Sequence, residues 1–118
     1  MTNTSNQNLQ TKQQILAEMR QHEKRLGSAE MNRAIQNEPD ENRRKELLDI
    51  RRNYEEARKN LENAVLEKIG LRLKEQENEL KNALNELTNV LEKINNTVAV
   101  LRTVNLVTSI VGRIVSIF

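Results

Sequence analysis

His22 is the only histidine of the chain and the first residue to consider for acid–base or metal chemistry. It lies on the apolar face of a predicted helix, and only Glu18 and Glu23 are near it in the sequence. A metal site or a general base needs partners at fixed spacing, and one histidine beside glutamates on a helix is an unspecific pattern. The pattern therefore favours a packed residue over a functional one.

Three arginines, Arg44, Arg51 and Arg58, are spaced by seven residues and would line one stripe of a helix, as a phosphate-binding surface requires. However, glutamates are interleaved among them at the spacing of helical ion pairs, and no aromatic residues are interleaved to stack on bases. All 17 acidic residues and all but two of the 19 basic residues lie within 1–94, so this part has no net positive charge. The pattern favours a salt-bridged, solvated helix face, and nucleic-acid binding is the weakest alternative function.

Other residues that could do chemistry are not arranged for it. Glu75, Glu77 and Glu79 alternate along a predicted helix, and alternate helical residues point in different directions. Cysteine is absent, which removes thiol chemistry and cysteine-based zinc sites, and no glycine-rich phosphate loop occurs. We therefore predict a non-enzymatic protein with no catalytic, cofactor-binding or metal-binding residues.

The composition predicts an all-α protein of one domain. Of 118 residues, 31% are charged and only 2% are aromatic, with three glycines and one proline. So little turn material favours long helices over sheets, and the cores must consist of Leu, Ile and Val layers. The absence of cysteine and of an apolar N-terminal segment indicates a cytoplasmic protein, with membrane association as an alternative.

The chain divides into four predicted segments. Residues 1–9 are polar and are expected to form a flexible leader, and residues 10–36 an N-terminal helix in which Gly27-Ser28 could stop and restart the helix. Pro39 breaks the pattern, because proline disrupts a helix interior but fits a first turn. Residues 40–94 form a polar helical shaft, and residues 95–118 form an apolar C-terminal helical segment.

Apolar residues recur at steps of three and four from residue 47 to residue 118, with a change of register near Gly70. This pattern predicts one extended, heptad-patterned helix over 40–118, about 120 Å long. The alternative is a compact four-helix bundle, with further breaks near Gly70 and at Asn95-Asn96-Thr97.

The C-terminal segment has the clearest requirement for a partner. From residue 95 onward there is no acidic residue, and Arg102 and Arg113 are its only charges. On a helical wheel a narrow polar stripe, which includes both arginines, is surrounded by a wide apolar arc, wider than the seam of a two-stranded coiled coil. The segment must therefore pack against several helices or against lipid. Ten uncharged residues between the arginines are too few for a typical membrane span, which needs about 20.

These observations predict a helical assembly protein that associates through its C-terminal helix, most simply as a homo-oligomer or with another helical protein. The alternative is a peripheral membrane or membrane-active protein that inserts residues 98–118. The residues expected to carry the interaction are Leu80, Leu87, Ile94, Leu101, Val104, Val111, Val115 and Phe118.

Overall fold

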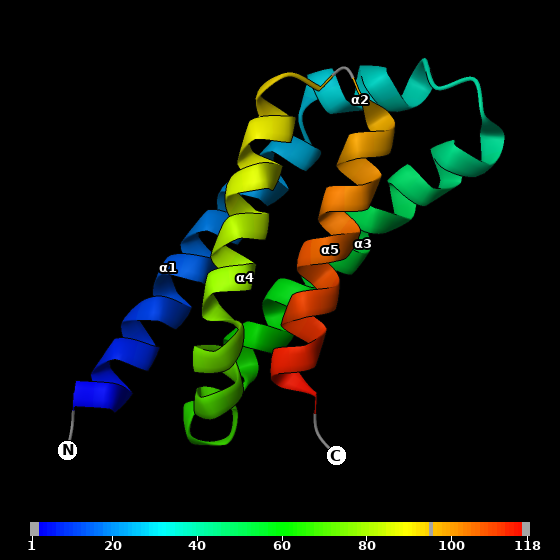
Figure 1. The fold of residues 1–118 in the computed structure, drawn as a ribbon. Coiled ribbons are helices and arrows are strands. Elements are labelled where there is room, and N and C mark those ends of the chain that lie inside the picture. The colour runs from blue at the N-terminus through cyan, green and yellow to red at the C-terminus, as the bar shows by residue number, and fades with distance from the viewer. Residues whose placement is uncertain (1–2, 95, 117–118) are drawn as a thin grey trace.

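In the part of the chain described, the protein folds into five helices and contains no strand (Figure 1). The computed structural model describes the backbone of residues 3–94 and 96–116, and side chains from Gln7 onward. The helices are α1 (Asn3–Leu26), α2 (Ala29–Gln36), α3 (Glu41–Asn63), α4 (Leu66–Glu92) and α5 (Thr97–Val115). The all-α prediction is confirmed.

The molecule measures 54 × 28 × 19 Å, and four of its helices form a bundle. Helices α1 and α4 run in one direction, and α3 and α5 run in the other (Figure 1). Within the bundle, α1 packs mainly against α3 and α4, and α5 packs mainly against the same two helices. The short helix α2 lies across one end of the bundle and contacts α3.

The prediction of one extended helix over 40–118 is wrong, and the alternative of a compact four-helix bundle is the observed architecture. The chain leaves the helical conformation at Ala64 and Val65, where both residues have extended backbone angles. No glycine or proline stands there. Instead, Lys12 of α1 donates hydrogen bonds from its Nζ to the carbonyl oxygens of Glu62 (3.1 Å) and Ala64 (2.9 Å). These bonds satisfy carbonyls that an uninterrupted helix would have used.

Gly70, where the sequence pattern placed this break, lies inside α4 and is buried. A Cβ atom at this position would be 3.0 Å from Nδ2 of Asn8, closer than ordinary packing allows. Glycine at this position leaves room for the Asn8 amide of α1, and the break in the helix lies at Ala64 and Val65 instead.

The N-terminal helix starts earlier than predicted. Helix α1 begins at Asn3 rather than at residue 10, so residues 3–9 are helical and not a separate leader; Met1 and Thr2 lie outside the described residues. The stop at Gly27-Ser28 does occur: the Ser28 side chain caps α2 by accepting a hydrogen bond from the backbone N–H of Met31 at 3.2 Å. The predicted 10–36 helix is therefore two helices.

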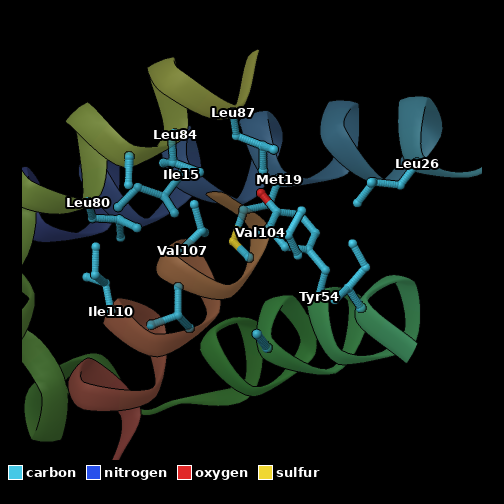
Figure 2. Close-up of a cluster of buried hydrophobic side chains, with 14 of the residues drawn as sticks. Ile15, Met19, Leu26, Tyr54, Leu80, Leu84, Leu87, Val104, Val107 and Ile110 are labelled. Atoms are coloured by element: carbon cyan, nitrogen blue, oxygen red, sulfur yellow. The ribbon is translucent and has the colours of Figure 1, made fainter. Parts of the chain in front are cut away.

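The core runs the length of the bundle and is almost wholly aliphatic, as the composition requires. Figure 2 shows side chains from α1, α4 and α5 converging on one layer, with Tyr54 of α3 beside them. Most of these side chains are fully buried, among them Met19, Leu87 and Val107. The apolar faces of the four helices thus cover one another within a single chain.

Leu84→Ala is expected to lower the free energy of unfolding by about 2–5 kcal/mol, because Leu84 is 1% exposed and its loss leaves a cavity. Leu106→Ala on α5 is the matched control, since Leu106 is 39% exposed and should cost less than about 1 kcal/mol. Urea denaturation monitored by circular dichroism measures both. Equal losses would contradict the assigned core.

Candidate functional site

The residues predicted to carry association lie inside the bundle. Leu80, Leu87, Val104 and Val111 are fully buried, Ile94 and Leu101 are each 7% exposed, and Val115 is partly buried. Phe118 lies outside the described residues. In this fold α4, α5 and the connection between them, which holds Ile94, therefore place seven of the eight predicted residues in intramolecular contacts.

Helix α5 fills a slot between α3 and α4. Its buried side chains cover a wide arc of the helix: Val100, Leu101, Thr103, Val104, Val107, Ile110, Val111 and Ile114. The predicted polar stripe points away from the core: Arg102, Asn105, Ser109, Gly112 and Arg113 are exposed and Ser116 is partly so. The expectation that this segment needs several helical neighbours is met by two helices of its own chain.

Few polar contacts join α5 to the rest of the described chain. At its start, Thr97 Oγ1 donates to Glu38 Oε1 at 2.7 Å, and this hydrogen bond helps to hold the pKa of Glu38 below its ordinary value. Near its end, Arg113 pairs with Glu79 at 3.0 Å, and Arg72 Nε donates to the carbonyl of Ile114 at 2.8 Å. Apolar packing therefore supplies most of what holds α5 in the slot.

A buried polar network connects α1, α3 and α4. His22 Nδ1 lies 2.6 Å from the Tyr54 hydroxyl, and His22 Nε2 lies 2.8 Å from Thr88 Oγ1. Thr88 Oγ1 in turn donates to the carbonyl of Leu84 at 3.1 Å. One arrangement satisfies every group: Tyr54 donates to Nδ1, and the Nε2–H donates to Thr88. His22 is a packed residue, as its sequence pattern predicts, whereas no sequence pattern indicates Tyr54 and Thr88 as its partners.

Burial controls the protonation of this network. It lowers the pKa of His22 to about 4, and it raises the pKa of Tyr54 with the help of the nearby charges of Glu18 and Glu23. Burial also raises the pKa of Glu18. At neutral pH the imidazole is therefore uncharged, and the hydroxyl of Thr88 is directed to a backbone carbonyl instead of to the imidazole. Because the imidazole donates to Thr88 and does not accept its proton, this direction of hydrogen bonding does not activate Thr88 as a nucleophile.

A groove of about 470 Å³ opens beside His22 between α1 and α4. It is lined by Glu18, Gln21, His22, Arg25, Asn85, Thr88, Leu91 and Glu92. The lining mixes both charges with amides, and Arg25 is already bonded to Glu30 and to the carbonyl of Leu91. Within the described residues no three His, Asp or Glu side chains converge as metal ligands would.

The three arginines of the α3 stripe have partners within the chain. Arg58 forms two hydrogen bonds with the Glu23 carboxylate, at 2.8 and 3.0 Å, and a third with Glu62. Arg51 donates to Asn32 at 2.8 Å, and Arg44 donates to the carbonyl of Glu38 at 3.3 Å. The stripe joins α3 to its neighbours, so its geometry gives nucleic-acid binding no support.

Comparisons with protein-family models, with curated proteins and with solved structures found no match.

The buried histidine predicts a loss of stability in acid. The unfolded chain binds a proton at His22 near pH 6.5, and the folded chain binds it only near pH 4. The contribution of the neutral imidazole to the free energy of unfolding is therefore complete above pH 6.5 and falls as the pH drops below it. At about 1.4 kcal/mol per pH unit the loss at pH 4 is about 3 kcal/mol.

His22→Gln is the control, because glutamine is polar but does not titrate. Urea denaturation at pH 7 and pH 4 should show the natural protein losing about 3 kcal/mol more than the variant. Carboxylates titrate in both proteins, so the difference isolates His22. Parallel pH profiles would show that the imidazole is not held neutral.

Proposed function

We propose that the protein is a non-enzymatic helical interaction protein whose binding element is α5, and that its first partner is a second copy of itself. The observation that supports this proposal is the slot between α3 and α4. Eight residues of α5 are buried in it, and without them the facing surfaces of α3 and α4 would expose a large apolar area to water. A helix with the apolar face of α5 must therefore fill this slot.

The outer surface of the bundle offers less to a partner. Six large apolar side chains are exposed among the described residues, and they are distributed over four helices and the α3–α4 connection: Leu9, Leu48, Val65, Leu71, Val98 and Leu106. Isolated exposed apolar residues are normal on soluble proteins. The buried face of α5 is therefore a better candidate for recognition than its exposed face.

Light scattering across a concentration series is the test. The full-length chain should give masses above that of the 13.7 kDa monomer at tens of micromolar, with unchanged helix content. Val98→Ser with Leu106→Ser should leave these masses unchanged, because both residues lie on the exposed side of α5. A monomer at every concentration would refute self-association, and a lower mass for the double variant would assign it to the exposed side.

Membrane binding is the second candidate, and one observation favours it. Helix α5, with 19 residues, is long and apolar enough to cross a bilayer, a property it shares with core helices of soluble proteins. Of the 18-residue stretch of α5 that is apolar enough for a membrane span, 44% is buried within the bundle. To meet lipid with its apolar face, α5 would have to leave the slot.

We expect the protein to be absent from the floating fraction with both neutral and anionic liposomes at neutral pH, because the apolar face of α5 is already covered. Flotation with anionic liposomes would support the membrane function instead. In that case Arg102→Ala with Arg113→Ala should weaken binding to anionic lipid, while Ile110→Ser with Ile114→Ser should abolish binding to both.

A further inference from the structure

At the connection between α4 and α5 the structure has a turn, whereas the residue pattern is that of a continuous helix. The connection spans residues 93–96, of which Asn95 lies outside the description, and it contains neither glycine nor proline. The apolar register continues across it at steps of three and four, through Leu87, Val90, Ile94, Thr97 and Leu101. This pattern is that of one uninterrupted helix from Leu66 to Val115, about 75 Å long.

Side chains from other helices hold the turn. Arg25 of α1 donates from Nε to the carbonyl of Leu91 at 3.1 Å, which a continuing helix would use for its own hydrogen bond. The carboxylate of Glu30 accepts a hydrogen bond from the backbone N–H of Ile94 at 3.4 Å. On the far side of the turn, Thr97 donates to Glu38.

One local device supports the turn as well. The side chain of Asn96 caps α5 by accepting a hydrogen bond from the backbone N–H of Ala99 at 3.0 Å. An N-cap of this kind stabilises a helix start and is lost when the helix continues through it. The hairpin is thus stabilised by one cap and several tertiary contacts, while the local sequence also permits the straight form.

We propose that α5 is exchanged between two copies of the chain: α4 and α5 straighten into one helix, and each α5 fills the slot between α3 and α4 of the other copy. This inference rests on the proposed function and specifies its mechanism. The buried contacts of α5 are the same in both forms, so only the turn and its caps differ between monomer and dimer. Exchange therefore allows residues such as Leu87, Leu101 and Val104 to be both the core of a monomer and the interface of a dimer.

The test uses the absence of cysteine from the chain. Glu79 on α4 and Arg113 on α5 form an ion pair at 3.0 Å, and both side chains are about half exposed. The variants Glu79→Cys and Arg113→Cys are mixed, refolded together and treated with a short bismaleimide. Exchange is expected to give a covalent 79–113 dimer in the mixture and much less in either variant alone. A chain that carries both cysteines, crosslinked within the monomer, verifies the reach of the reagent.

A second variant shifts the equilibrium. Asn96→Ala removes the cap from the turn of each of the two monomers that associate, while the straight helices of the dimer have no such cap to lose. It should therefore raise the association constant about 25-fold, from about fivefold per cap. Asn105→Ala is the matched control: it makes the same change on the exposed side of α5, where the structure shows no cap, and should have no effect. Four glycines inserted after Asn96 should give a folded monomer, because glycines disfavour the continuous helix that exchange requires and leave α5 in its own slot.

The outcomes separate the two proposals. A dimer by light scattering without the 79–113 crosslink would overturn exchange and leave self-association standing. A monomer for the natural chain and for Asn96→Ala would overturn both. A crosslinked dimer that the glycine insertion abolishes is the result expected.

Discussion

The fold depends on long basic side chains that end the helices of their neighbours. Lys12 of α1 bonds to the last carbonyls of α3, and Arg25 of α1 does the same for α4. Arg51 of α3 reaches the carbonyl of Leu26 at the end of α1, and Arg72 of α4 reaches that of Ile114 in α5. In each case a cation meets the negative end of a helix dipole. Helices α3 and α4 thereby end without a glycine or proline after them.

This dependence explains which features the sequence could predict. Helical periodicity is local, so the all-α class, the Ser28 restart and the exposed polar stripe of α5 follow from residue spacing. The end of α3 does not, because Lys12 lies about 50 residues away from the carbonyls that it bonds. The partners of His22 were missed for the same reason: Tyr54 and Thr88 come from other helices. Such pairs can be identified only when it is known which helices lie next to one another, and the local residue pattern does not contain this information.

The wide apolar arc of α5 illustrates the same limit for the candidate site. The pattern correctly required several neighbouring helices, but it contained no information on whether those helices belong to the same chain. The stepping of apolar residues through the α4–α5 connection favoured a straight helix, whereas Arg25, Glu30 and Asn96 stabilise the turn. The residues predicted to carry association are therefore core residues in this fold. A role in assembly requires that the same side-chain contacts form within one chain in the monomer and between two chains in the dimer.

The position of Tyr54 gives the protein a spectroscopic reporter of its own. The chain has no tryptophan and one tyrosine, so its near-ultraviolet circular dichroism and intrinsic fluorescence originate almost entirely from this phenol. Its ring is fully buried, and its hydroxyl is bonded to the imidazole of His22, 32 residues away on another helix. A rigid, asymmetric environment of this kind gives a phenol a distinct dichroic band that vanishes when packing loosens. The docking of α1 on α3 can therefore be observed in the natural chain, without a label.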